Sequence, residues 1–164
     1  MKQSSFDDKG RYIIEDYSSF PPFSSFLPGI AGPMGIPMWV FYVNRGQGIT
    51  SFGIENKNNP IVEFQPANKA YRYTTIDGFR TFIKFSEQEF GKLYEPFSTW
   101  ATQDSTRKMF IGMNELEIQE ENTQCGLKTN VVAFIVPGDN HAALSRTITI
   151  QNTMDHPITI EILD

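Results

Sequence analysis

The chain has 164 residues, of which 40% are hydrophobic and 13% aromatic, so it can build the core of one domain. Its formal net charge of −5, with no basic cluster to offset it, excludes a typical nucleic-acid-binding protein. A single cysteine, Cys125, excludes an internal disulfide framework. No segment reads as a signal peptide or approaches the roughly 20 apolar residues that span a bilayer. We therefore expect one soluble domain over residues 1–164 in the cytoplasm, with neither membrane nor nucleic acid as a partner.

The first part of the chain predicts short strands with a period of two. Residues 11–16 form the first of them. Residues 17–37 are rich in proline and glycine, which excludes a helix, but they also carry apolar side chains. We expect an ordered loop packed on the domain there. Residues 38–43 are apolar on both faces and predict a buried central strand, and residues 49–54 and 61–64 predict the next two strands.

A hairpin and a short helix are predicted in the middle of the chain. The hairpin pairs residues 70–76 with residues 79–85 around an Asp-Gly pair at 77–78, which supplies the positive φ angles of a type I′ turn. Residues 86–97 begin with capping-box spacing and form the only plausible helix. A glycine and a proline within that segment limit the helix to a turn or two.

The last third of the chain predicts long strands over residues 108–120, 127–136 and 145–152, and a final strand within residues 157–164. Many short strands with regular turns predict an all-β, antiparallel β-sandwich with little or no helix. A jelly roll, an immunoglobulin-like sandwich and half of a larger sandwich all fit this pattern. Because the final strand ends without a turn or polar tail, we expect the chain to be an amino-terminal part of a larger multidomain protein.

Metal and acid–base chemistry find little support in the sequence. The two histidines, His141 and His156, both fall in predicted turns without the spacing of metal ligands. Glu115 and Glu117 share one strand face, and residues 120–121 read as a solvated strand end, so no spacing of a glycosidase acid and base is indicated. We expect no catalytic residue, no metal and no cofactor in this chain.

Aromatic and planar polar residues are the more informative set. Sugar recognition needs a flat apolar face for the C–H side of the ring and hydrogen-bonding groups for the hydroxyls. The residues with these properties, which we take as candidate carbohydrate or interface contacts, are Trp39, Asn44, Arg45, Gln47 and Trp100. The alternative is that Trp39 belongs to the core and Arg45 pairs with a carboxylate, since sandwich cores routinely contain aromatic residues.

Nearly the whole chain resembles the amino-terminal region of the cellobiose-phosphorylase-like glycoside phosphorylases. The resemblance rests on extended runs of sequence and not on one short motif. These runs are residues 25–32, 35–47, 51–57, 64–71, 78–82, 147–152 and 157–164.

The resemblance implies that the chain belongs to a large enzyme that phosphorolyses β-linked gluco-oligosaccharides with inversion. In that family a β-sandwich precedes a helical linker and an (α/α)₆ barrel, which carries the general acid and receives the oligosaccharide and phosphate. The sandwich borders the catalytic cleft and takes part in homodimer contacts. This chain contains no counterpart of the barrel, so the resemblance implies a non-catalytic segment that shapes the cleft or the dimer interface. The alternative is a stand-alone carbohydrate-binding or structural β-sandwich.

Overall fold

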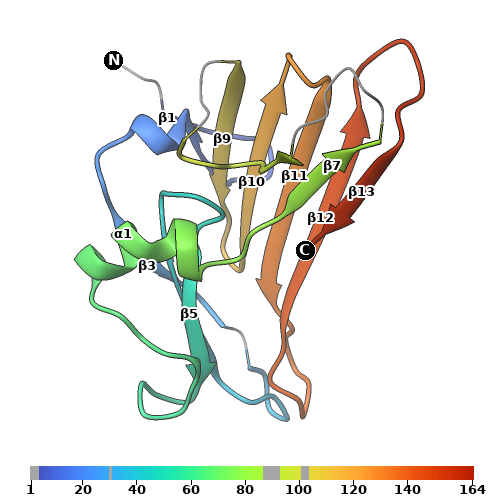
Figure 1. Cartoon of the computed structure of the whole chain (residues 1–164). Coiled ribbons are helices and arrows are strands. Elements are labelled where there is room, and N and C mark those ends of the chain that lie inside the picture. Colours follow the sequence, from blue (N-terminus) through green and yellow to red (C-terminus); the bar gives the residue numbers. More distant parts are fainter. Residues whose placement is uncertain (1–3, 30, 87–92, 101–103) are drawn as a thin grey trace.

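The computed structural model describes residues 4–29, 31–86, 93–100 and 104–164. The fold is an all-β sandwich in which every strand pairing is antiparallel, and the sheets are not closed into a barrel, as the sequence predicts (Figure 1). One layer is a large six-stranded sheet, and the other consists of two smaller sheets side by side. Within the described residues, no helix is long and apolar enough to cross a membrane.

The large sheet has the strand order β1-β2-β9-β10-β11-β12. Its strands are β1 (Ser4–Phe6), β2 (Tyr12–Glu15), β9 (Ser105–Ile111), β10 (Glu115–Asn122), β11 (Leu127–Ile135) and β12 (Leu144–Asn152). The strict alternation of buried and half-buried residues along β11 shows that one face of this sheet lies against the core.

Two smaller sheets cover the inward face of the large sheet. The four-stranded sheet has the order β3-β4-β5-β6, with β3 (Ser24–Leu27), β4 (Met38–Val43), β5 (Ile49–Ile54) and β6 (Pro60–Val62). The three-stranded sheet has the order β13-β7-β8, with β7 (Phe82–Phe85), β8 (Leu93–Tyr94) and β13 (Ile160–Leu163). Each contributes to its own core cluster against the large sheet.

The predicted strand over residues 70–76 is wrong, because this segment lies in helix α1 (Ala67–Asp77). Along the helix only residues 70, 71, 74 and 75 are buried or half-buried, which is the spacing of one helical face. That face contacts the outer surface of the four-stranded sheet, where Ala70 packs with Phe41 and Val43. The sequence of β4 is apolar on both faces. The helix therefore covers the apolar side chains on the outer face of this strand.

Other boundaries also differ from the sequence prediction. The single strand expected over residues 108–120 is two strands, β9 and β10, which form a hairpin around a turn closed by a hydrogen bond from Gly112 N to Glu115 O at 2.9 Å. The loop at residues 17–37 contains a short 3₁₀ turn, η1 (Tyr17–Ser19), and strand β3. The expected helix at residues 86–97 lies partly outside the described residues, and its described end contains β8.

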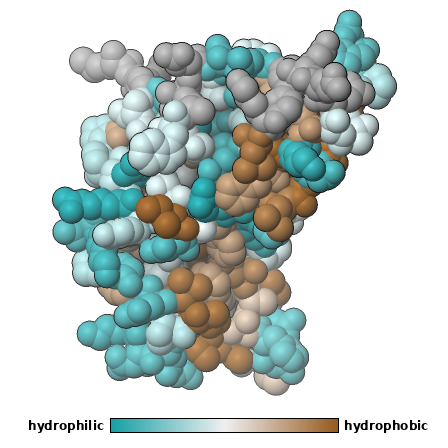
Figure 2. Space-filling view, viewed as in Figure 1, coloured by the Kyte–Doolittle hydropathy of each residue, from teal (hydrophilic) through white to brown (hydrophobic). Residues whose placement is uncertain are grey.

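The final strands are confirmed as β12 and β13, but they belong to different layers. After β12 the chain leaves the large sheet, and β13 pairs with β7 in a register that places Ile162 opposite Ile83. It is the edge strand of the three-stranded sheet, and Figure 2 shows hydrophobic side chains gathered over this region. Ile162 and Leu163 are 54% and 69% exposed there.

Candidate functional site

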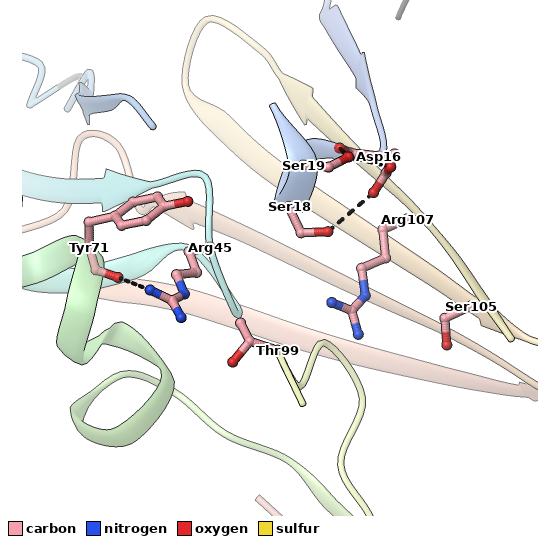
Figure 3. Close-up of a pocket in the computed structure, with 8 residues that line it drawn as sticks. All are labelled: Asp16, Ser18, Ser19, Arg45, Tyr71, Thr99, Ser105 and Arg107. Atoms are coloured by element: carbon pink, nitrogen blue, oxygen red, sulfur yellow. Dashed lines mark hydrogen bonds between the residues drawn. The ribbon is translucent and has the colours of Figure 1, made fainter. Parts of the chain in front are cut away.

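A polar hollow of about 520 Å³ opens at one end of the space between the two layers. Figure 3 shows Arg45 and Tyr71 on one side of it and Arg107 on the other. We call it the polar hollow. Its lining residues are Asp16, Ser18, Ser19, Arg45, Tyr71, Thr99, Ser105 and Arg107.

The inner wall of the polar hollow is an ion pair on the inward face of the large sheet. Arg107 of β9 lies directly opposite Glu120 of β10 in the strand register, and Arg107 Nε donates to Glu120 Oε2 at 2.5 Å. The two residues are only 4% and 1% exposed. They continue the inward rows formed by Met109 and Ile118, so the interior changes from apolar to charged towards this end.

Glu120 is held by three further donors. Phe97 N donates to its Oε2 at 2.8 Å, Ser105 Oγ donates to its Oε1 at 3.3 Å, and the Tyr94 hydroxyl also donates to Oε1. Burial, and then the negative charge of Glu120, raise the pKa of Tyr94 well above its usual value, so this phenol remains a donor. A buried carboxylate needs such compensation.

The same network fixes the Arg107 side chain beside the polar hollow. In addition to its ion pair, Arg107 Nη2 donates to the Ser98 carbonyl oxygen at 2.6 Å. Since both sides of the guanidinium are bonded to buried or half-buried partners, its orientation is set by the fold and not by a ligand.

The opposite wall joins the turn after β4 to helix α1. Arg45 Nη1 donates to the Tyr71 carbonyl oxygen at 3.3 Å, and the Arg45 guanidinium carbon lies 5.2 Å from the centre of the Tyr71 ring. The turn itself is anchored by the buried Tyr17 hydroxyl, which donates to the Gly46 carbonyl oxygen at 2.5 Å. Gly46 has a φ of 56°, a left-handed conformation that favours glycine.

The rim of the polar hollow consists of hydroxyl groups around one carboxylate. Asp16 has a φ of 48°, in the left-handed region. Its carboxylate accepts hydrogen bonds from Ser18 Oγ at 3.2 Å and from Ser19 Oγ (Figure 3). The hydroxyl of Thr99 lies on another side of the same space.

The charges around the polar hollow balance. Two cations, Arg45 and Arg107, are matched by the carboxylate of Asp16 and, behind the wall, by that of Glu120. Because the side chain of Glu120 is completely buried, it is not placed for proton transfer to a ligand. The arrangement therefore favours hydrogen bonding to a neutral, hydroxyl-rich ligand over acid–base catalysis or tight binding of an anion.

Of the five residues singled out in the sequence, the structure brings only Arg45 into the polar hollow. Asn44 is fully buried, where its Nδ2 donates to the Tyr17 carbonyl oxygen at 3.0 Å and its Oδ1 accepts from Phe23 N at 2.8 Å. Asn44 thus ties the segment around η1 to the end of β4.

The other three candidates lie apart from one another. Gln47 is buried, and its Nε2 donates to Thr81 Oγ1 at 2.9 Å. Trp39 lies opposite Gly53 in the β4–β5 register, and its Nε1 donates to the Asn56 carbonyl oxygen at 3.0 Å. Trp100 is 89% exposed and borders a different, much smaller pocket.

Sequence reasoning missed several residues of the polar hollow. Glu120, read as part of a solvated strand end, is instead buried, because it shares strand parity with Leu116 and Ile118. That parity, and the matching position of Arg107 relative to Met109, was the available signal. Tyr71 was missed because its segment was assigned to a strand.

The thiol and the possible metal ligands do not form a competing site in the part of the chain that the structure describes. Burial raises the pKa of the Cys125 thiol to about 11, so the thiol remains protonated and unreactive at neutral pH. Among the described residues, no three or more histidine, cysteine, aspartate or glutamate side chains gather as a metal site. No protein-family model and no curated protein sequence matches the chain.

Proposed function

We propose that the chain is the amino-terminal β-sandwich of a cellobiose-phosphorylase-like glycoside phosphorylase, and that its polar hollow binds carbohydrate without catalysing a reaction. The polar hollow carries this proposal, because it combines fixed guanidinium groups, hydroxyls and balancing carboxylates. Such a lining matches the many donors and acceptors of an uncharged sugar.

The geometry also connects two of the sequence runs that carry the family resemblance. Residues 35–47 contribute Arg45, and residues 64–71 contribute Tyr71, and these two residues are hydrogen-bonded to each other in the wall of the polar hollow. Two of the runs that resemble the phosphorylases therefore supply one wall of the polar hollow.

Binding of sugars to this chain tests the proposal. We expect D-glucose, cellobiose or cellotetraose to shift the amide NMR signals of residues around the polar hollow. Thr99→Val removes one hydroxyl at constant shape and should weaken binding roughly fivefold, the cost of about one hydrogen bond. The matched control is Thr147→Val on the exposed face of β12, which should leave binding unchanged. The absence of sugar-induced shifts at the polar hollow would overturn the binding role.

The proposed membership of the glycoside phosphorylase family is tested separately. The full product of the gene should release phosphate from a sugar 1-phosphate in the presence of a gluco-oligosaccharide acceptor, whereas this chain alone should release none. Release of phosphate by neither protein would refute the family assignment while leaving carbohydrate binding by the sandwich intact.

A homodimer contact belongs to the same proposal and is supported by the edge of the three-stranded sheet. Among the described strands β13 pairs with β7 alone, and it carries the exposed apolar residues Ile162 and Leu163. Exposed apolar strand edges favour association with another chain. Sedimentation of the chain over a range of concentrations checks this point, and a strictly monomeric protein would contradict it.

A further inference from the structure

Tyr71 borders a second hollow in addition to the polar one. This second hollow has a volume of about 350 Å³ and lies between residues 22–24 and the start of helix α1. We call it the apolar hollow. Tyr71 thus stands between two cavities, and Arg45 contacts it from the side of the polar hollow.

The apolar hollow differs in chemistry from its neighbour. Its lining is mostly apolar and includes the rings of Pro22, Phe23 and Tyr71. The Phe23 ring is held edge-on against Tyr42, with ring centres 6.4 Å apart, and its backbone N–H donates to Asn44. The apolar wall is therefore anchored to the core.

Polar groups border this apolar wall on the helix side. Asn68 and Arg72 are one helical turn apart on α1, and both side chains are exposed. Flat apolar rings beside amide and guanidinium donors are the combination that binds the C–H face and the hydroxyl edge of a sugar ring.

We infer that the polar and apolar hollows form one elongated site around Tyr71, and that its ligand is an oligosaccharide of at least two sugar rings. One ring places its hydroxyls among the guanidinium and hydroxyl groups of the polar hollow. The next ring lays its C–H face against Phe23, with its hydroxyls towards Asn68 and Arg72. This inference rests on the proposed carbohydrate-binding function and adds the length and direction of the ligand.

A monosaccharide and an apolar ligand both fit this geometry less well. A single sugar ring occupies one hollow and leaves the other hydrated. A purely apolar molecule in the polar hollow would displace water from its guanidinium, carboxylate and hydroxyl groups without replacing the hydrogen bonds to that water, which is costly. A chain of sugars presents both chemistries in sequence across the shared Tyr71 wall.

Titration of the chain with D-glucose, cellobiose and cellotetraose, followed by amide NMR, tests the inference. We expect cellotetraose to bind roughly tenfold more tightly than glucose, because it adds an aromatic contact and several hydrogen bonds. Signals of Phe23 and Asn68 should move with the longer sugars and stay in place with glucose confined to the polar hollow.

A matched pair of helix variants isolates the apolar hollow. Ala67 is exposed and borders it, whereas Lys69 is exposed on the same turn without bordering it. Ala67→Leu should fill the apolar hollow and reduce cellotetraose binding to the level of glucose, and Lys69→Leu should have no effect. Both variants keep a good helix former at an exposed position, so the fold is retained.

The outcomes of these experiments distinguish failure of the elongated site from failure of the proposed carbohydrate binding. If glucose and cellotetraose bind equally and Ala67→Leu changes neither, while Thr99→Val weakens both, the elongated site is wrong and the proposed function stands. If no sugar shifts any signal at the polar hollow, the proposed carbohydrate binding fails and the elongated site fails with it.

Discussion

Glu120 occupies a position where the alternation of inward and outward residues along β10 predicts an apolar side chain. It lies on the inward face of β10, in the same row as Leu116 and Ile118. Its charge is tolerated there because Arg107 and three other donors surround the carboxylate. The interior thereby ends in a rigid polar wall and not in a closed apolar core.

Glu120→Gln should therefore destabilise the fold strongly. The amide keeps the shape but leaves the buried Arg107 charge without its counter-ion, which costs about 3 kcal/mol of unfolding free energy. Urea unfolding measures the change. Glu121→Gln is the matched control, because Glu121 is exposed on the same strand and should change stability by less than about 0.5 kcal/mol. Equal stability of the two variants would show that the buried pair is not needed.

At the scale of elements, the segment 67–77 shows where a local sequence pattern predicts the wrong secondary structure. Its Tyr-Arg-Tyr-Thr alternation and the Asp-Gly pair that follows resemble a hairpin, yet it forms helix α1. Tertiary packing outweighs the local pattern, because the outer face of β4 needs an apolar cover and the helix supplies it through Ala70. The helical spacing of residues 70 and 74 was the signal that the alternation concealed.

Gly78 distinguishes the helix from the predicted hairpin. It closes the helix with a hydrogen bond from its N–H to Thr74 O at 3.1 Å. A Cβ atom at Gly78 would overlap that carbonyl oxygen and lie 3.0 Å from Thr74 Oγ1 and 3.2 Å from Ile49 O. Gly78→Ala should therefore cost roughly 2 kcal/mol of unfolding free energy, measured by urea unfolding.

The companion variant Asp77→Ala makes this test specific. Asp77 is the exposed last residue of α1, so its replacement should be nearly neutral. A type I′ turn would instead need positive φ angles at both positions, and both substitutions would then be costly. Similar large losses in the two variants would contradict the helix.

The strands were more predictable than the site. β4, β5, β11 and β12 follow from hydrophobic patterns that extend over six or more residues, and their predicted bounds are within one residue of those observed. Arg45 was selected from a turn anchored by a buried strand, and it does line the polar hollow. Arg107 and Tyr71 come from distant segments, and no local pattern specifies which segments meet across a sandwich.

At the scale of the whole molecule, one polar cluster joins all three sheets. Arg146 of β12 binds the Asp164 carboxylate through Nη1 to Oδ2 at 2.5 Å and Nη2 to Oδ1 at 3.0 Å. Thr81, which precedes β7, donates to Asp164 Oδ1 at 2.8 Å and accepts from Gln47 Nε2 at 2.9 Å. Gln47 follows β4, so the cluster connects the large sheet to both small sheets.

Acid should weaken this connection between the layers. Burial opposes ionisation of Asp164, but the hydrogen bonds from Arg146 and Thr81 outweigh it and hold the pKa of this carboxyl below its usual value of 3.8. A carboxyl with a lowered folded-state pKa stabilises the fold above the unfolded-state pKa, and that contribution is lost as the pH falls through the folded-state value. Because Asp164 is partly exposed, the contribution is at most about 1 kcal/mol.

Asp164→Asn should accordingly be less stable than the parent chain at pH 6, and the difference should shrink as the pH falls from 4 to 3. Urea unfolding at pH 6, 4 and 3 measures the difference, with Asp8→Asn at an exposed position as the control. Asp8→Asn should track the parent chain at every pH. A constant gap between Asp164→Asn and the parent chain down to pH 3 would mean that the carboxylate charge does not hold the layers together, and that the loss comes from altered packing around Thr81 and Gln47.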